Sequence, residues 1–385
     1  MSFIFYRDRY NSMLNDRDLK GRISGGLLPR LAFCLGLLPL AQAPAAWAQT
    51  GIRLLDQPAI AVKAPDRVVL IAVATAGSRI VAVGEHGVIA YSDDNGQSWH
   101  QGSVPVDVTL TAVAFATPQQ GWAVGHDGVI LHTTDGGATW QEQLNGIQAN
   151  QLITTAAQAA VAGNDPSLGT AHALARAAHF TEEGPVNPFL SIWVQDPNDA
   201  IVFGAYRLAM KTTDGGKTWV DWSLHIGDTL SHNIYDVAPV GQNLYLVGET
   251  GLVFESTDGG NSFPAGTSPG ANSLFEALPT GDGGVFACGV AGAAFRSEDS
   301  GKSWQSVNFG TSDNLAAGVV LQSGVLVVGS ESGIPYVSRD HAQSFTALPQ
   351  PQPLAIYGLA QAANGDVVEV GSGGAVVVPA ADFKS

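Results

Sequence analysis

Short apolar runs separated by polar turns recur along most of the chain. In Trp122–Trp140, an apolar run ends at Gly125, a polar turn follows, and a second apolar run leads into Thr-x-Asp-x-Gly-x-Thr-Trp. Two apolar runs of strand length joined by a tight turn predict paired β-strands, and the second turn predicts the start of a third strand. The pattern therefore predicts a unit of short antiparallel strands.

The same unit occurs seven times at a spacing of about 40 residues, with one interval doubled. A period near 40 with several strands per unit is typical of the blades of a β-propeller. The aligned glycines are Gly84, Gly125, Gly204, Gly248, Gly289, Gly329 and Gly371. Full blades are expected at residues 66–104, 108–144, 188–224, 231–267, 272–308 and 313–348.

The seventh unit is shortened, and the chain contains a strand-like segment before the first unit. Residues 354–378 supply three strands only, while residues 51–58 (GIRLLDQP) stand alone. An open sheet edge is a liability that ring closure removes. We therefore expect Ile52–Leu55 to form the outer strand of blade seven. The predicted fold is an all-β, seven-bladed β-propeller spanning residues 49–385 and closed by an N-terminal strand.

The doubled interval contains an insertion at residues 145–187. Its segments Gln148–Ala162 and Thr170–Phe180 are rich in alanine and lack the alternation of strands. Alanine has the highest helix propensity, and the segment between the two, Gly163–Pro166, breaks a helix. The sequence predicts a helical hairpin between blades two and three.

The N-terminal residues 1–48 are predicted to be a signal peptide with a basic leader. Six basic residues precede the apolar run Leu31–Leu40, and Ala46-Trp47-Ala48 fits a cleavage site. Initiation at Met13 would give a signal of more usual length. Cys34 follows the bulky Phe33 inside the apolar run, so we do not expect lipidation. The expected location is the periplasm, or the lumen in a phototroph.

Charge and cysteine content narrow the function classes. Removal of residues 1–48 takes away six of 18 basic and three of 34 acidic residues, which leaves a net charge of −19. A strongly negative net charge disfavours nucleic acid and anionic membranes as partners. Only Cys288 remains, inside an apolar run, so we expect neither an intrachain disulfide nor a reactive thiol.

Six units contain the motif Ser/Thr-x-Asp-x-Gly-x-Ser/Thr-Trp/Phe. Its aspartate is suited to accept hydrogen bonds from turn amides, and its aromatic residue to pack between blades. The spacing matches neither an EF-hand nor a phosphate loop, so we interpret the motif as structural. In the sixth copy Ala342 replaces the glycine. The aspartates are Asp94, Asp135, Asp214, Asp258, Asp299 and Asp340.

These repeats resemble the Asp-box, or BNR, repeats of sialidases and other propellers. Seven of them, with a VG-x-x-G phrase before each box and a signal peptide, are most similar to the photosystem II stability/assembly factor-like family. The sequences EEGPVNPFL and GAYRL after the insertion resemble its exported bacterial branch. The resemblance implies a propeller without catalytic activity that assists assembly of a membrane or envelope complex. Phototroph members are lumenal, bind a reaction-centre precursor and use an arginine-rich patch.

The sequence gives little support for catalysis. A sialidase needs an arginine triad, which the seven arginines after residue 48 do not supply convincingly. The alternative hypothesis is a sialidase-like or glycosidase-type hydrolase that uses two carboxylates at the channel mouth. No metal-ligand spacing of His or Cys is present, so we expect no metal and no cofactor.

Binding is expected at the turns that join the second and third strand of each blade, because loops held by a rigid scaffold commonly carry function. We call them the mouth turns: Glu85–Gly87, His126–Gly128, Ala205–Arg207, Glu249–Gly251, Val290–Gly292, Glu331–Gly333 and Ser372–Gly373. A surface with few basic groups favours a protein partner, or one that carries cations. The candidate binding residues are Glu85, His86, His126, Asp127, Tyr206, Arg207, Glu249 and Glu331.

Overall fold

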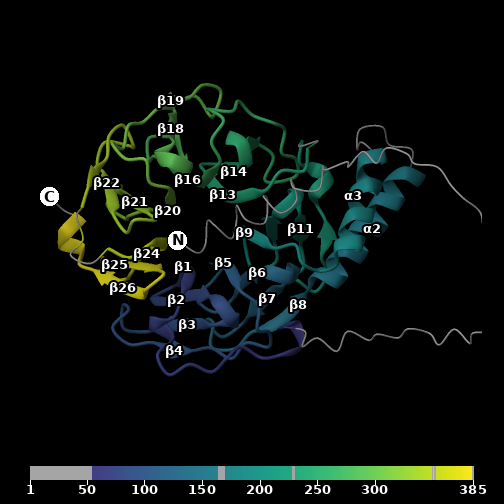
Figure 1. Cartoon of the computed structure of the whole chain (residues 1–385), viewed down its shortest axis with the longest axis horizontal. Coiled ribbons are helices and arrows are strands. Elements are labelled where there is room, and N and C mark those ends of the chain that lie inside the picture. The colour runs from purple at the N-terminus through teal and green to yellow at the C-terminus, as the bar shows by residue number, and fades with distance from the viewer. Residues whose placement is uncertain (1–53, 164–169, 228–229, 349, 351–352, 384–385) are drawn as a thin grey trace, which may run out of the picture. The chain divides into compact units, whose positions relative to one another are not determined.

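Seven antiparallel sheets form a ring in the computed structural model (Figure 1). The structure describes residues 54–163, 170–227, 230–348, 350 and 353–383. The sheets belong to the compact unit Arg53–Ser385. The predicted signal peptide and its cysteine lie outside the described residues.

Each sheet is a blade whose strands follow the order of the sequence. The strands of blades one to three are β1 (Leu70–Ala76), β2 (Arg79–Gly84), β3 (Ile89–Ser92), β4 (His100–Gln101), β5 (Leu110–Phe115), β6 (Gly121–Gly125), β7 (Ile130–Thr133), β8 (Gln141–Leu144), β9 (Phe189–Val194), β10 (Ala200–Gly204), β11 (Ala209–Thr212) and β12 (Val220–Asp221). Those of blades four to seven are β13 (Ile234–Val240), β14 (Asn243–Gly248), β15 (Val253–Ser256), β16 (Leu274–Pro279), β17 (Val285–Gly289), β18 (Ala294–Ser297), β19 (Gln305–Ser306), β20 (Leu315–Val320), β21 (Leu326–Ser330), β22 (Pro335–Ser338), β23 (Thr346–Ala347), β24 (Ile356–Gln361), β25 (Val367–Gly371) and β26 (Gly374–Val378).

The ring exists because both faces of each blade are apolar. The second strand of every blade is buried along nearly its whole length, so its alternate side chains must be covered by the preceding and the following blade. The first strand of each blade packs against the first strand of the next, and β24 packs against β1. The predicted seven-bladed propeller is confirmed.

The predicted closure by an N-terminal strand is wrong for the residues that the structure describes. Blade seven has the three strands β24–β26, and Leu54–Asp56 forms a 3-10 turn. The carbonyl of Leu54 accepts a hydrogen bond from the amide of Asp107 (2.9 Å), and the amide of Ala59 donates to Val104 (3.1 Å). These bonds hold the segment beside the connection of blades one and two. Ile52 and Arg53 lie outside the described residues.

Apolar packing joins blade seven to blade one instead. The core cluster at this junction combines Ile80 and Ala82 of β2 with Val368 and Val370 of β25. The first and last blades therefore meet through the same kind of interface as other neighbouring blades.

Blade four also lacks a regular outer strand. Only an isolated bridge, Phe254 to Ala265, stands where the other full blades have a fourth strand. Pro264 follows the box aromatic Phe263 and has no amide hydrogen to donate. The hydrogen-bond ladder between β15 and the outer segment is therefore shortened to this bridge.

The Asp-boxes form repeated hydrogen-bonded turns. In the first box, Ser92 donates to Asp94 (2.8 Å) and accepts from the amide of Gly96 (2.8 Å). Asp94 also accepts from the amide (2.8 Å) and hydroxyl (2.5 Å) of Ser98, and these bonds lower its pKa to about 2. The carboxylates therefore act as turn acceptors.

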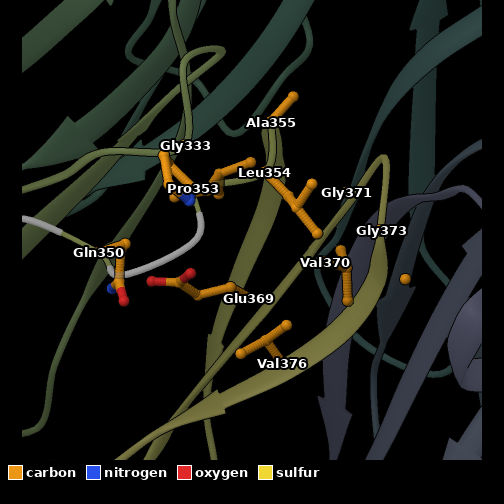
Figure 2. Close-up of a pocket in the computed structure, with 12 residues that line it drawn as sticks. Gly333, Gln350, Pro353, Leu354, Ala355, Glu369, Val370, Gly371, Gly373 and Val376 are labelled. Carbon is orange, nitrogen blue, oxygen red and sulfur yellow. The ribbon is translucent and has the colours of Figure 1, made fainter.

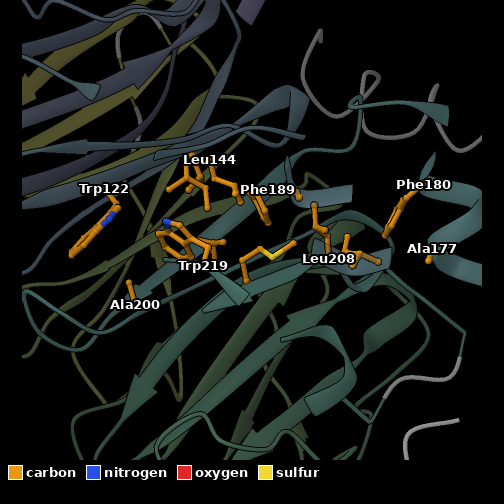
Figure 3. Close-up of a cluster of buried hydrophobic side chains, with 14 of the residues drawn as sticks. Trp122, Leu144, Ala177, Phe180, Phe189, Ala200, Leu208 and Trp219 are labelled. Atoms are coloured by element: carbon orange, nitrogen blue, oxygen red, sulfur yellow. The ribbon is translucent and has the colours of Figure 1, made fainter. Parts of the chain in front are cut away.

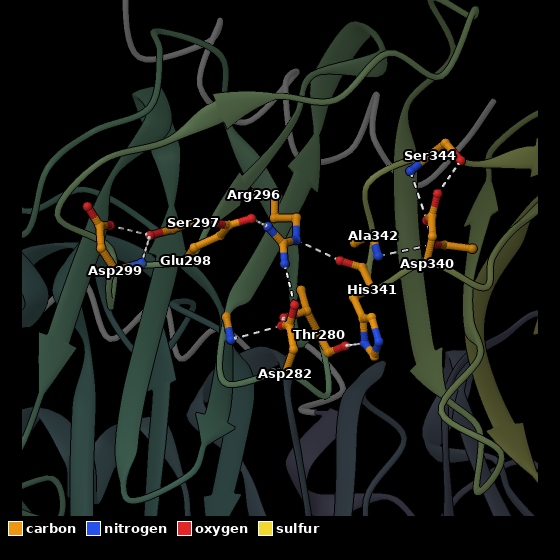
Figure 4. Close-up of polar contacts among 12 residues, drawn as sticks. Thr280, Asp282, Arg296, Ser297, Glu298, Asp299, Asp340, His341, Ala342 and Ser344 are labelled. Carbon is orange, nitrogen blue, oxygen red and sulfur yellow. Dashed lines mark hydrogen bonds and ion pairs between the residues drawn. The ribbon is translucent and has the colours of Figure 1, made fainter.

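The sixth box forms despite its alanine. Ala342 has a φ of 63°, a left-handed conformation that glycine adopts more readily, yet its amide still donates to Ser338 (2.9 Å). The side chain of Arg296 in blade five supports this turn through polar contacts (Figure 4). Arg296 donates to the carbonyl of His341 (2.6 Å) and pairs with Asp282 (2.5 Å).

The predicted helical hairpin is present as α2 (Gly146–Ala162) and α3 (Thr170–Glu183). Asn145 caps α2 in a capping box with Gln148. One face of the hairpin, including Ile153 and Phe180, joins a core cluster shared with blades two and three (Figure 3). No helix that the structure describes is both long enough and apolar enough to cross a membrane.

A buried ion pair fastens the hairpin to blade three. The side chains of Arg176 on α3 and Asp221 on β12 are 6% and 1% exposed, and their Nη2 and Oδ2 atoms are 3.4 Å apart. Arg176 also donates to Ser223. Burial lowers the pKa of Arg176, and the neighbouring Asp221 counters this effect.

We expect Arg176→Ala to lower the free energy of unfolding by about 3–5 kcal/mol, because Asp221 would be left as a buried, unpaired charge. Urea unfolding measures this value. Arg67→Ala, at a side chain that is 82% exposed, is the matched control and should change it by less than about 0.5 kcal/mol. A loss below about 1 kcal/mol for Arg176→Ala would show that the pair does not anchor the hairpin.

Asp258→Asn tests the box carboxylates. Burial opposes ionisation of Asp258, but hydrogen bonds from Ser262 and Ser256 outweigh it and lower the pKa to about 2. A lowered folded pKa stabilises the protein above about pH 4, and this stabilisation is lost as the pH falls through 2. The substitution should cost about 1 kcal/mol at pH 7, a value reduced for solvent screening, and almost nothing at pH 2. A pH-independent cost in thermal unfolding would contradict this account.

Candidate functional site

The seven mouth turns are fixed at the same end of the innermost strands. In each blade, the first turn residue donates its amide hydrogen to a carbonyl at the start of the innermost strand, as in Glu85 to Val69 (3.3 Å) and Glu249 to Asn233 (3.0 Å). In six blades the second strand ends in a glycine that passes very close to this carbonyl, whereas in blade six it ends in Ser330, one residue after the aligned Gly329. A Cβ at Gly84 would collide with the oxygen of Val69, which explains why glycine occupies the end of this strand.

A β-bulge in each innermost strand lies next to its mouth turn. The register of every first strand shifts by one residue near its start, for example at Tyr235 in β13 and Tyr357 in β24. The pKa of Tyr357 is raised by burial and by the nearby charges of Glu331 and Glu85. The ring thus brings together acidic turn residues of blades six and one around an aromatic residue of blade seven.

The candidate residues of blades one, four and six remain open to solvent or border it. The His86 side chain is 59% exposed, and its Nδ1 lies 3.0 Å from Asp107 Oδ1. Glu249 Oε2 accepts from the amide of Asn233 (3.2 Å), and Glu331 Oε2 accepts from the Asn314 side chain (2.9 Å). These bonds hold the carboxylates in place.

The helical hairpin packs over the candidate residues of blades two and three. The η4 turn (His126–Gly128) contacts α2, and burial raises the pKa of Asp127. The Tyr206 ring packs edge-on against Phe180 and His179 of α3, with centroids 6.4 and 6.0 Å away. Arg207 is buried. The structure therefore divides the eight predicted residues into an open set (Glu85, His86, Glu249, Glu331) and a set beside the hairpin (His126, Asp127, Tyr206, Arg207).

A pocket lies between the mouth turns of blades six and seven (Figure 2). Its cavity volume is about 50 Å³, and the cavity opens to solvent. Its walls include Gly333 and Gly373 of these two turns, together with the apolar side chains of Leu354 and Val376. Glu369, from β25, supplies its carboxyl group.

Glu369 is the residue that sequence reasoning missed. It is 8% exposed, and its Oε1 makes no hydrogen bond within the described part of the chain. Burial raises its pKa from 4.5 to about 7. The signal was present in the repeats, because the phrase VEVG places an acid where other copies read VAVG or WAVG.

Within the described residues, the other reactive groups do not form a second site. Cys288 lies within β17 and is fully buried, and burial raises the pKa of its thiol. Trp222 stacks on His225 with ring centroids 3.7 Å apart, which agrees with a packing role. In the part of the chain that the structure describes, no three His, Cys, Asp or Glu side chains are grouped to hold a metal ion.

The Glu369 carboxyl should make stability depend on pH. A raised folded pKa stabilises the protein below about pH 4.5, and this stabilisation is lost as the pH rises through 7. The gain in unfolding free energy from Glu369→Gln should therefore grow by about 2 kcal/mol between pH 5 and pH 8 in urea titrations. Glu182→Gln, on the exposed side of α3, is the control. An equal effect of Glu369→Gln at both pH values would refute the assignment.

Comparison with known proteins places the chain in a family. The family model described as Photosynthesis system II assembly factor YCF48 matches residues 92–161 and 183–379, more than half of the chain. The photosystem II assembly lipoprotein Ycf48 of Synechococcus sp. (strain CC9902) is 31% identical over 128 residues. The aligned stretch covers 32% of this chain and 38% of that relative.

Solved structures share the fold. YCF48 bound to D1 peptide has a TM-score of 0.61 and 16% identity, covering 84% of this chain and 99% of that one. YCF48 from Cyanidioschyzon merolae has a TM-score of 0.59 and 14% identity, covering 81% and 96%. The WD40 propeller of Doa1 has a TM-score of 0.59 and 12% identity, covering 86% and 98%. At these identities the likeness shows the fold alone, whereas the family model shows that the chain belongs to the family of the photosynthesis system II assembly factor YCF48.

Proposed function

We propose that the chain is an exported, non-catalytic assembly or stability factor that holds a protein of a membrane or envelope complex. The observation that carries this proposal is the match of the YCF48 family model across most of the propeller. One solved structure of similar fold is YCF48 bound to D1 peptide, so a protein ligand is compatible with this architecture. Because the family match is to an assembly factor, the hydrolase alternative is not carried forward.

Export is supported by two independent features. The first is the basic leader, apolar run and small-x-small site of residues 1–48. The second is the relative from Synechococcus, which is a lipoprotein. A periplasmic location, or a lumenal one in a phototroph, follows as part of the proposal.

The proposed contact surface is the open part of the mouth turns, on blades four to seven and one. The hairpin packs against the turns of blades two and three, which makes them less accessible. The second turn residues His86, Thr250, Ala291 and Ser332 are exposed, and so is Ser372, the first residue of the shorter seventh turn. Acidic side chains on this surface, Glu85, Glu249 and Glu331, favour a partner with a basic surface, and electrostatic complementarity speeds its association.

The test is affinity purification of the tagged protein from solubilised native membranes beside two double variants. Glu249→Gln with Glu331→Gln removes charge from the mouth turns while keeping a side-chain acceptor at each position. The matched control, Glu182→Gln with Asp382→Asn, removes two exposed charges elsewhere. We expect the mouth variant to recover several-fold less of one membrane protein and the control to recover as much as the unmodified chain.

A third variant, which lacks residues 148–183, separates the two surfaces. Retention of the partner by this variant is expected if the open mouth turns make the contact. Loss of the partner with a folded propeller would place the contact on the hairpin and contradict the proposed surface. Recovery of no specific membrane protein by any variant would contradict the scaffold function.

A further inference from the structure

One blade departs from the others at a buried position. Two residues before the end of its second strand, every other blade has a fully buried apolar side chain; these are Ala82, Ala123, Val202, Leu246, Ala287 and Val328. Blade seven has Glu369 at this position, with 8% of its surface exposed. A carboxyl that replaces an alkyl group in a core is costly unless it is paired. Packing alone does not explain its presence.

The pocket around Glu369 has room for a ligand group. Figure 2 shows the Glu369 side chain extending from β25, with Leu354 and Val376 among the surrounding residues. Leu354 and Val376 are 52% and 48% exposed, so apolar surface borders the opening. A Cβ at Gly373 would collide with the Leu354 side chain, and this glycine therefore allows Leu354 its position beside the turn.

The charge inside the pocket lacks a counterpart. Of the described residues that line it, Glu369 alone has a titratable side chain, and desolvation alone accounts for its raised pKa of about 7. The walls from the Gly333 turn, from the segment that leads into β24, and from β25 and β26 offer no cation. A cationic group entering the pocket would supply the missing partner for Oε1 and favour the ionised carboxylate.

A lysine side chain fits this combination of walls and charge. Its four-carbon stem packs along apolar surface, while its ammonium is a compact donor. An arginine fork is larger and is best satisfied by bidentate pairing, and a metal ion needs more ligands than one carboxylate. We propose that the pocket between blades six and seven binds a lysine side chain of the partner. This inference rests on the proposed function, because it identifies the chemistry that the partner presents at the mouth turns.

The experiment measures binding of short peptides to the full chain by NMR shift titration. The probes are Gly-Ser-Lys-Ser-Gly and the same peptide with norleucine or arginine in place of lysine. The lysine peptide should bind about tenfold more tightly than the norleucine peptide at pH 8, with shifts confined to blades six and seven. Its affinity should fall roughly tenfold at pH 6, because a carboxyl with a pKa of about 7 is then mostly protonated.

Variants of the chain separate the carboxylate from the apolar walls. Glu369→Gln should lose about tenfold in lysine affinity, and Glu182→Gln should lose none. Glu369→Val, which restores the residue type of blade six, checks that a folded, apolar pocket also fails to bind. Equal binding of the lysine and norleucine peptides, tighter binding of the arginine peptide, or full binding by Glu369→Gln would overturn the proposal.

The peptide titration does not depend on capture of a native partner. If purification from membranes recovers no partner while the lysine peptide binds, the pocket assignment stands and the scaffold function fails. If a partner is recovered but the lysine peptide does not bind, the scaffold function stands and the pocket assignment fails.

Discussion

The structure depends on the need to cover two apolar faces of every sheet. A blade whose second strand is buried along its length cannot be stable alone, because half of its alternate side chains would face water. Each neighbour covers one face, and only a closed ring covers the faces of the first and last blades. The Asp-boxes, and side-chain hydrogen bonds between blades such as that from Arg296 to His341, then fix the turns between strands that packing has already placed.

The same constraint makes Glu369 an exception among the buried residues of the blades. The interior positions between blades accept alkyl side chains in six blades, so a carboxyl in the seventh is a departure that the fold does not require. It lies below two mouth turns and beside exposed apolar side chains. The hairpin is anchored through Arg176 and packs against the mouth turns of blades two and three, not against those of blades six and seven. Together these features leave one open arc of mouth turns, which is acidic and contains a pocket.

Much of this architecture could be predicted from the sequence, because the repeats carry strong local signals. The glycine that ends the second strand in six blades, the box aspartates and the alanine-rich insertion each specify local structure without distant information. The closure and the pocket could not be obtained in this way. Whether Leu54–Asp56 joins blade seven or blade one depends on competing long-range bonds, here those of Leu54 and Ala59. The partial burial of Tyr206 and the burial of Arg207 depend on where the hairpin packs, which repeat spacing does not encode.

The most direct test of the central claim is site-specific photo-cross-linking in cells, with the probe at Ser372 in a mouth turn or at Ser98 in an Asp-box. Both positions are exposed, and they lie in different kinds of turn, Ser372 in blade seven and Ser98 in blade one. The account predicts a cross-link from Ser372 to one membrane or envelope protein and none from Ser98. A cross-link to the same protein from Ser98 but not from Ser372 would contradict it.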